Sequence, residues 1–534
     1  MIDVLIIGSG GAGLTAALTA KEKGASILVV GKAYPTNSQT SMAQGGMNAA
    51  LGNVGDDSIE SHIADTIKSA RGLCDEAMVR QMCEDAPKTI AWLESLGVPF
   101  SRLDNGKSDT ETVAQRQMGG ASAKRACYAQ DYTGLKILHT LYDTCLKVDI
   151  EFLDEYYLLN LITKDACVKG ATFLDIRTGD VKQINAKSVI VATGGYGSLY
   201  HGYTTNAYGS TGDGITAVLR AGGKVSDMEF VQFHPTALKG SSILISESAR
   251  GEGGYLVNTD GQRFVDELKP RDVVARAIFS EFQKGQEVFL DVRHLGEEKL
   301  MELLPQEVAL CKLHEHINPA KEIIPIKPVA HYSMGGIDVN NALEVTGIKG
   351  CFAVGECSNT KVHGANRLGG NSLLEITAFG KQAGKNAYTF AQSQEDNEVD
   401  TSQLKEDKKE IEALYTKENS INFYEHRELL GKLLYEKVGI VRDNKILGLA
   451  KDNISTIKNQ IHQMGLSDKS PTNNTNLTDL LEFKNALPLA SAIISSALER
   501  DESRGAHYKL GFEIQDDEYF KRHIVLGWGE LICK

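Results

Sequence analysis

Five segments place histidine, arginine, serine or glutamate beside glycine or proline at the ends of apolar runs. They are FVQFHPTAL with His234, ISESARGEGG with Ser246, Glu247 and Arg250, LKPRDVVARAI with Arg271, HYSMGG with His331, and HGANRLGGNSLLE with His363 and Arg367. Buried polar groups of this kind cost free energy unless they face a ligand. Each residue alone has an ordinary explanation, as a core histidine or a surface cation. Together they indicate a binding or catalytic site.

The N-terminal segment has the pattern of a dinucleotide-binding unit. IDVLII predicts a buried strand, LTAALTAKEKG predicts an amphipathic helix ending at Gly24, and SILVV predicts a second strand. Gly8, Gly10 and Gly13 lie at the turn between strand and helix. There they permit a tight turn, the approach of a pyrophosphate and close helix–strand packing. A purely structural glycine turn is the alternative, because the acid expected to bind a ribose after the second strand is missing.

Later segments must complete the same sheet. KSVIVATGG (187–195) and KGCFAVGE (349–356) predict two more strands, STGDG (210–214) precedes a predicted helix, and another helix is predicted from Leu373. We therefore predict an α/β fold with a Rossmann-like domain split between residues 1–225 and 350–395. The intervening residues 226–349 are numerous enough to form a domain of their own.

The chain changes in character after residue 390. QSQEDNEVDTSQLKEDKKE is polar and acidic and predicts a linker. Apolar spacing beyond it predicts a helical domain at 405–515, followed by a tail at 516–534. Within that domain, SPTNNTNLTD predicts a loop with a helix N-cap near Thr478.

Composition limits the classes of function. The net charge of −13 over 534 residues disfavours nucleic-acid binding, which needs clustered lysine and arginine. The nine cysteines show no CxxC pair, so we expect reduced thiols and neither a metal site nor an iron–sulfur cluster on this chain. Met1 leads directly into a strand, and no apolar run approaches the ~18 residues of a spanning helix. A cytoplasmic chain is expected, with docking to a membrane partner left open.

The motifs of this chain, and the order in which they follow one another, resemble those of the flavoprotein subunits of succinate dehydrogenase and fumarate reductase. The superfamily of these subunits also includes L-aspartate oxidase. The resemblance covers residues 1 to about 515 and rests on GSGGAG, SQTSMAQGG, LHTL, ATGG, STGDG, HPTAL, SESARGEGG, PRD, HYSMGG, VGE, HGANRLGGNSLLE and ESRGAH. It implies a Rossmann-like FAD-binding domain, an inserted α+β capping domain at 226–349 that closes over the substrate, and a C-terminal helical domain.

The resemblance also implies which residues hold FAD. Lys32 stands where the family often has a basic or hydroxyl residue, which accounts for the missing acid. Members with covalently bound flavin have a histidine at the position of Gln39, so FAD is expected to be non-covalent here. Loss of the link would lower the flavin potential and favour fumarate reduction. The implied FAD-binding residues are Gly8, Gly10, Gly11, Ala12, Gly13, Lys32, Ser38, Gln39, Thr40, Gln44, Gly45, Gly46, Ala192, Asp213, Glu356, Ser372 and Leu373.

The implied substrate is a four-carbon dicarboxylate, fumarate or succinate. His234 and Ser246 match residues that bind one carboxylate, and His331 and Arg367 match those that bind the other. A planar guanidinium suits this role because it presents a two-pronged donor to a carboxylate.

The resemblance implies that flavin N5 delivers hydride to one carbon of fumarate and that Arg271 protonates the other. Glu247 and Arg250 would return the proton to Arg271, because arginine does not normally deprotonate in proteins. A purely structural ion pair between Glu247 and Arg250 is the alternative.

Two other functions are weighed against this one. L-aspartate oxidase has similar motifs, but it places a glutamate where this chain has Met118, and a thioether cannot bind an ammonium group. A non-catalytic flavin electron-transfer protein would not need the full set of histidines and arginines. The resemblance further implies an iron–sulfur partner subunit, with membrane-docking or thiol-oxidising subunits as further candidates and a peripheral position on the inner membrane face.

Overall fold

The computed structural model describes residues 1–103, 112–396 and 399–532. Its main sheet has the strand order β6-β2-β1-β9-β8-β7, and β16 also pairs with β9. The pairs of β1 with β2, β1 with β9, β2 with β6 and β16 with β9 are parallel, whereas β7, β8 and β9 are antiparallel. The strands are β1 (Ile2–Ile7), β2 (Ile27–Gly31), β6 (Glu151–Asp154), β7 (Tyr156–Lys164), β8 (Cys167–Asp175), β9 (Val181–Val191) and β16 (Cys351–Ala353). Strand β16 thus joins strands from the first part of the chain in one sheet, as the sequence predicts.

Helix α1 (Gly11–Glu22) packs between α10 (Asn371–Gln392) and α4 (Thr133–Lys147). Its residues are buried nearly all round, so the prediction of an amphipathic helix is wrong. Small residues permit this packing: a Cβ atom at Gly384 of α10 would lie 2.3 Å from the carbonyl oxygen of Ala16. The glycine turn at the head of α1 is thus fixed between two other helices.

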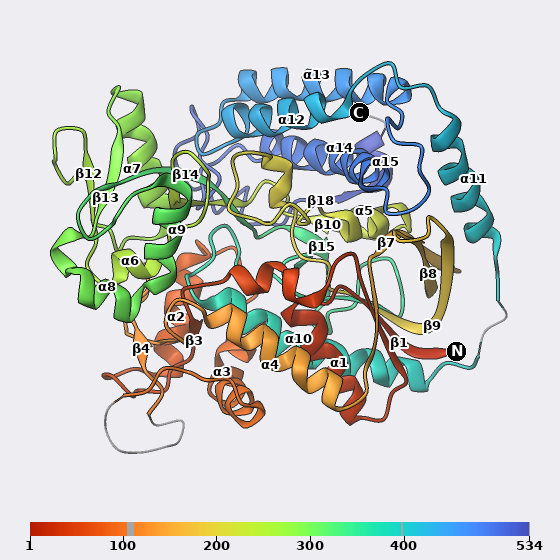
Figure 1. Cartoon of the computed structure of the whole chain (residues 1–534), viewed down its shortest axis with the longest axis horizontal. Helices are drawn as coiled ribbons and strands as arrows, with labels where there is room; N and C mark the ends of the chain where they lie inside the picture. The colour runs from red at the N-terminus through yellow and green to blue at the C-terminus, as the bar shows by residue number, and fades with distance from the viewer. Residues whose placement is uncertain (104–111, 397–398, 533–534) are drawn as a thin grey trace.

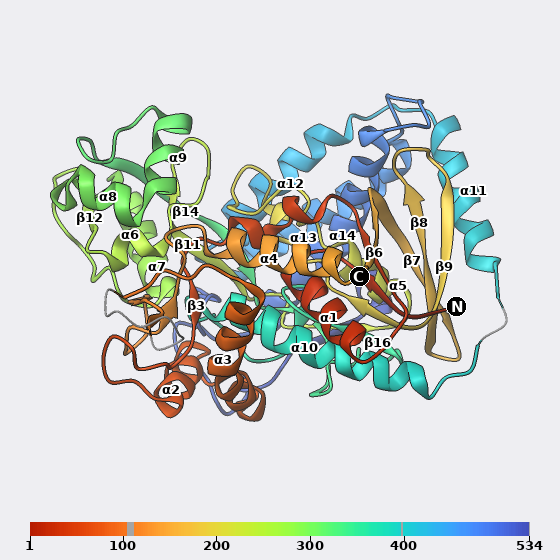
Figure 2. The ribbon, with the colours of Figure 1, turned by 60° about the horizontal axis from the view of Figure 1, so that its bottom comes forward.

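The inserted residues form a lobe at one end of the molecule (Figures 1 and 2). Its antiparallel sheet has the order β11-β14-β13-β12, and its own apolar core runs from Leu238 to Ile326. Helices α6 and α7 bring their first residues to the cavity between this lobe and the main sheet. The elements are β11 (Val231–Leu238), α6 (Glu247–Gly251), β12 (Tyr255–Asn258), α7 (Arg271–Gln283), β13 (Val288–Asp291), α8 (Glu297–Leu303), α9 (Pro305–Glu315) and β14 (Ile324–Ser333).

Smaller elements connect these parts. A sheet of order β3-β5-β4 lies near α2 and α3, and another of order β17-β15-β10-β18 joins the C-terminal segment to the start of the inserted lobe. The elements are β3 (Met47–Asn48), α2 (Ile59–Ser69), α3 (Glu76–Leu96), β4 (Gln115–Arg116), β5 (Ala126–Cys127), α5 (Asp213–Arg220), β10 (Lys224–Ser226), β15 (Gly336–Asp338), β17 (Ser358–Asn359) and β18 (Val525–Gly527).

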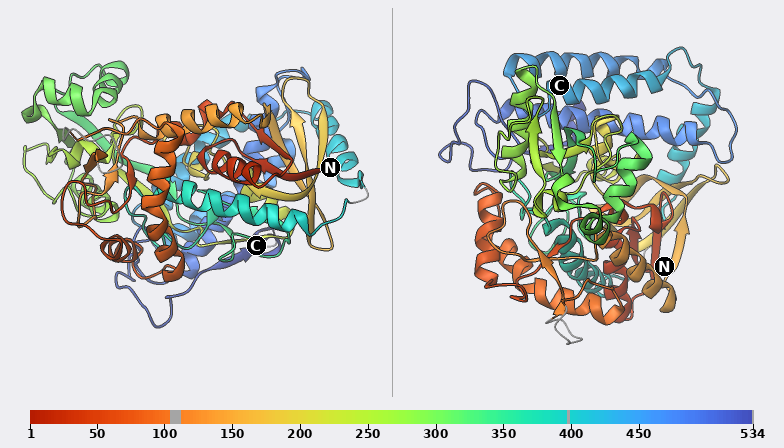
Figure 3. Two further views of the ribbon diagram at one scale, coloured as in Figure 1. Left: turned by 90° about the horizontal axis from the view of Figure 1, so that it is seen from below. Right: turned by 60° about the vertical axis from the view of Figure 1, so that its left-hand side comes forward.

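The C-terminal part is helical, with α12 and α13 side by side above α14 (Figures 1 and 3). Its helices are α11 (Ser402–Thr416), α12 (Phe423–Lys437), α13 (Asn444–Gln460), α14 (Thr475–Glu499) and α15 (Trp528–Ile532). The predicted linker is wrong from Ser402 onward, where α11 begins. The N-cap predicted near Thr478 is also wrong: Asn474 caps α14, and its side-chain oxygen accepts from the Leu477 N–H at 2.8 Å.

In the described ranges, no helix has the length and apolar character needed to cross a membrane.

Candidate active site

The glycine turn between β1 and α1 forms a close-packed cradle. Gly8 has φ +112°, and a Cβ there would lie 2.2 Å from the Ala192 carbonyl oxygen. A Cβ at Gly13 would lie 1.9 Å from the Gly8 carbonyl oxygen. Both contacts are with backbone, which cannot move aside. The turn therefore requires glycine, as in dinucleotide-binding folds.

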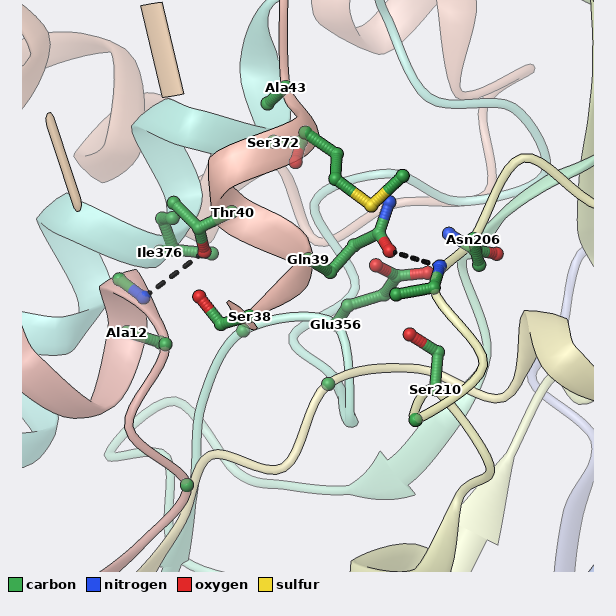
Figure 4. A pocket seen from close by; sticks show the side chains of 18 of the residues that line it. Ala12, Ser38, Gln39, Thr40, Ala43, Asn206, Ser210, Glu356, Ser372 and Ile376 are labelled. Atoms are coloured by element: carbon green, nitrogen blue, oxygen red, sulfur yellow. Dashed lines mark hydrogen bonds between the residues drawn. The ribbon is translucent and has the colours of Figure 1, made fainter. Parts of the chain in front are cut away.

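A large cavity extends from this cradle, and two buried polar atoms that line it lack partners. The Ser38 hydroxyl and the Gln44 side-chain oxygen have no hydrogen-bond partner in the described part of the chain. Thr40 instead accepts from the Gly11 N–H at 3.1 Å, and Gln39 accepts from the Ala207 N–H at 2.7 Å (Figure 4). Buried polar groups are normally paired. These residues therefore fit a polar cofactor such as FAD.

Lys32, directly after β2, lies in an ionic cluster. Its Nζ donates to Asp213 at 2.7 Å, to Glu482 at 2.7 Å and to the Thr211 hydroxyl at 2.9 Å. Burial opposes the charge on Lys32, but Asp213 and Glu482 overcome this effect and raise its pKa. The lysine at the end of β2 is thus paired with carboxylates from α5 and α14.

A buried group of charges lies where α6 and α7 begin. The Arg271 Nε and Nη2 atoms donate to Glu247 Oε2 at 3.0 and 2.7 Å, and Nη1 donates to Gln232 at 3.0 Å. Glu247 Oε1 accepts from the Gly119 N–H at 3.0 Å and lies 3.5 Å from Arg250 Nη2. Burial would raise the pKa of Glu247, but Arg271 and Arg250 reverse this and lower it. Glu247 is therefore a carboxylate between two guanidinium groups.

Two histidines face each other beside this group. The rings of His234 on β11 and His331 on β14 are 4.8 Å apart between centroids. His331 Nδ1 is hydrogen-bonded to the Thr205 hydroxyl at 2.7 Å, which fixes the ring. Burial, and then the neighbouring arginines, lower the pKa of both rings well below the usual range, so both are neutral at pH 7.

Arg367 lies over the Tyr332 ring, with its guanidinium carbon 4.3 Å from the ring centroid. Burial, followed by the charge of Arg271, lowers its pKa to about 10, so it is still a cation at neutral pH. Its Nε has no hydrogen-bond partner among the residues that the structure describes. A guanidinium with unused donors is suited to binding an anion.

The cavity brings together most of the residues singled out in the sequence. Three of them do not line the cavity. Gly13 and Arg250 lie behind residues that do, and His363 is hydrogen-bonded to Glu375 at 3.0 Å. Those that line the cavity are Gly8, Gly10, Gly11, Ala12, Lys32, Ser38, Gln39, Thr40, Gln44, Gly45, Gly46, Ala192, Asp213, His234, Ser246, Glu247, Arg271, His331, Glu356, Arg367, Ser372 and Leu373. Met118 lines it too.

Comparison with known proteins identifies the family of this chain. A family model described as "FAD binding domain" matches residues 3–373, and one described as "Fumarate reductase flavoprotein C-term" matches residues 427–530. The chain belongs to the fumarate reductase flavoprotein family. The predicted family, the FAD-binding α/β fold and the C-terminal helical part are thereby confirmed, and the chain is an FAD-dependent oxidoreductase subunit.

This flavoprotein is 38% identical to the fumarate reductase flavoprotein subunit of Haemophilus influenzae, over 99% of this chain and 92% of that protein. It is 39% identical to the 8-methylmenaquinol:fumarate reductase flavoprotein subunit of Wolinella succinogenes, over 99% and 90% of the two chains. Among solved structures it is similar to Escherichia coli quinol fumarate reductase, with a TM-score of 0.94, 36% identity, and coverage of 98% of this chain and 94% of that one.

Several residues that support the site of this flavoprotein were missed in the sequence. Gln232 holds Arg271, and it lies two residues before His234 in the same strand, which was a usable signal. Thr205 contacts His331, and Tyr332 contacts Arg367. Tyr332 directly follows His331 in the sequence. Glu482 gave no signal, because it sits in a helix that the apolar pattern explains completely.

Proposed function

We propose that this chain is the catalytic flavoprotein subunit that interconverts fumarate and succinate, with fumarate reduction as the favoured direction. The observation that supports this most strongly is the convergence of His234, His331, Arg367 and Arg271 on one cavity that continues into the FAD cradle. Four donors around a small space suit a molecule with a carboxylate at each end. Two relatives are named as fumarate reductase flavoprotein subunits, which supports this choice of substrate.

His234 and Ser246 bind one carboxylate in this proposal, and His331 and Arg367 bind the other. The first pair comes from β11 and the N-cap of α6, and the second from β14 and the segment before α10, so two parts of the chain meet on the substrate. Holding both ends fixes the double bond against the cofactor. FAD, when bound, supplies the hydride from N5.

Arg271 then donates the proton to the other carbon of fumarate. Its guanidinium shares Glu247 Oε2 through two hydrogen bonds, and Arg250 lies at the opposite oxygen. Glu247 can therefore pass a proton from Arg250 to Arg271 after each turnover. Succinate oxidation is the reverse of these steps.

The proposal is tested by reducing the bound flavin anaerobically with a low-potential dye and then adding fumarate. Rapid flavin reoxidation is expected with fumarate, and none with its cis isomer maleate, which cannot place its carboxylates at the two ends. Absence of reoxidation by fumarate while flavin stays bound would contradict the proposal.

L-aspartate oxidase is the alternative that a parallel assay can distinguish. Met118 is buried in the cavity, and its methyl group packs against Gly45. A thioether offers no partner for a substrate ammonium group, so we expect no peroxide from L-aspartate and oxygen. L-aspartate-dependent peroxide formation would favour the oxidase.

We also propose that FAD is held without a covalent bond, because Gln39 replaces the linking histidine. The Gln39 amide is held by the Ala207 N–H, and an amide is not a nucleophile that could join the flavin methyl group. Acid precipitation is expected to leave nearly all of the flavin in the supernatant. Free FAD added to denatured apoprotein controls for trapping, and flavin fluorescence that migrates with the denatured chain would contradict this assignment.

Electrons are proposed to arrive from an iron–sulfur partner subunit, with membrane-docking or thiol-oxidising subunits as further candidates. The names of one relative and two solved structures include a quinol, which supports a donor at the membrane. A peripheral position on the inner membrane face is part of the same proposal.

A further inference from the structure

A second group of buried charges lies where the inserted lobe meets the FAD-binding part, close to the substrate residues but not among them. It consists of Arg116 on β4, Asp131 before α4 and Glu307 on α9. All three are buried, and Asp131 is completely inaccessible. Neither the cofactor cradle nor the proposed proton path uses these residues.

Asp131 joins the two parts of the chain. Its Oδ2 accepts from the backbone N–H groups of Gln306 at 2.8 Å and Glu307 at 3.1 Å. Pro305, the first residue of α9, has no N–H, so these are the first free donors of that helix. A carboxylate at this position is also favoured by the helix dipole. Asp131 therefore fastens α9 of the lobe to the FAD-binding part.

Glu307 continues the connection to the substrate site. Its Oε1 accepts from the backbone N–H of Ser246 at 2.7 Å. The Ser246 hydroxyl caps α6 by accepting from the Ser248 N–H at 3.1 Å, and Glu247 is the next residue. A single series of hydrogen bonds thus runs from the FAD-binding part through α9 to the residues proposed to bind fumarate.

We propose that Asp131 and Glu307 form a latch that holds the inserted lobe against the FAD-binding part and positions Ser246 for the substrate. This inference rests on the proposed function, because it assigns Ser246 to the dicarboxylate. Asp131 and Glu307 act through α9 and Ser246, so they are positioning residues.

The charges make the latch sensitive to pH. Within the described residues, Asp131 Oδ1, Glu307 Oε2 and two nitrogens of Arg116 have no hydrogen-bond partner. Burial, and then the charge of Asp131, raise the pKa of Glu307 to about 8. Burial also raises the pKa of Asp131. The other titratable groups facing this cluster are Tyr128, Glu252 and Cys311.

The direction of the effect follows from linkage. An acid whose pKa is raised in the closed arrangement favours that arrangement while protonated. The full contribution of Glu307 is present below about pH 4.3, the ordinary pKa of glutamic acid, and is lost as pH rises through about 8. Above that pH, two carboxylates repel each other inside the contact. Because the loss accumulates between these two pKa values, we expect the KM for fumarate to rise from pH 6 to about pH 8 and to level off above it.

The test compares the KM for fumarate between pH 6 and 9.5 in the unaltered flavoprotein and three variants. Glu307→Gln keeps the acceptor for the Ser246 N–H but cannot ionise, so its KM should stay flat where that of the unaltered protein rises. Glu307→Ala should raise the KM about tenfold at pH 7, with a smaller change in kcat. Glu298→Gln, an exposed acid on α8, is the matched control and should follow the unaltered protein.

A second measurement does not depend on turnover. Asp131→Ala should increase the rate of limited proteolysis of the lobe several-fold at unchanged FAD content. An unchanged rise of the KM between pH 6 and 8 in Glu307→Gln, or unchanged proteolysis in Asp131→Ala, would overturn the latch. If the unaltered protein does not respond to fumarate at all, the proposed function fails, and proteolysis still decides whether the latch exists.

Discussion

Replacing Arg271 with lysine is expected to lower the rate of fumarate-dependent flavin reoxidation by about 10³-fold, within the range measured for loss of a general acid. Lysine cannot reproduce three directed N–H bonds, two to Glu247 and one to Gln232. Its ammonium would sit as a point charge, out of line with the fumarate carbon. Stopped-flow reoxidation of the dye-reduced enzyme measures the effect.

The cofactor provides an internal check on the Arg271→Lys variant. Arg271 donates its hydrogen bonds to Glu247 and Gln232, both outside the glycine cradle, so FAD content and the flavin spectrum should not change. Arg293→Lys is a matched control, because Arg293 is an exposed arginine of the same lobe paired with Asp291 at 2.8 Å. Near-normal turnover in Arg271→Lys would exclude Arg271 as the proton donor.

Replacing Gly13 with alanine is expected to reduce bound FAD at least tenfold. The new methyl group would lie 1.9 Å from the Gly8 carbonyl oxygen, so α1 and the turn would have to separate. Overpacking of this kind costs about 1–3 kcal/mol of unfolding free energy, and the displaced turn no longer fits a pyrophosphate. The flavin-to-protein absorbance ratio after gel filtration and the urea midpoint measure the two effects.

Gly448→Ala is the control for this experiment. Gly448 lies inside α13, and outside the helix's own backbone no described atom lies within 4 Å of the position that an alanine methyl group would take. Alanine is also the better helix former. This variant should keep its full FAD and be equally or more stable. An unchanged FAD content in Gly13→Ala would contradict the assignment of this glycine turn as the FAD-binding cradle.

Local patterns were enough to predict the cradle but not the surroundings that complete it. Gly8 and Gly13 lie within one strand–turn–helix unit, so spacing alone places them. The amphipathic prediction for α1 failed because α10, some 360 positions later in the chain, covers a side that a single segment would leave in water. A local sequence pattern predicts that a segment is helical, whereas the exposure of that helix depends on the elements packed against it.

In the substrate site, too, the sequence predicted some of the residues, and others were found only in the folded chain. His234, His331, Arg271 and Arg367 stand out because polar residues in glycine-flanked apolar segments need a reason to be buried. Glu307 does not stand out, because PQEVALCKLHE is an ordinary helix sequence and only the folded chain shows its contact with Ser246. Polarity after residue 390 suggested a linker, yet α11 forms there, and one face of it packs on the main sheet.

The ion pair between Lys32 and Glu482 also sets an order of events during protein synthesis. The two residues are 450 positions apart, and at roughly 5–20 residues per second the ribosome needs about 20–90 s to make the second after the first. Throughout that time the end of β2 carries a lysine without its second carboxylate. The ionic cluster of the cofactor site is therefore completed late, and a nascent chain that stops before α14 would pair Lys32 with Asp213 but lack Glu482.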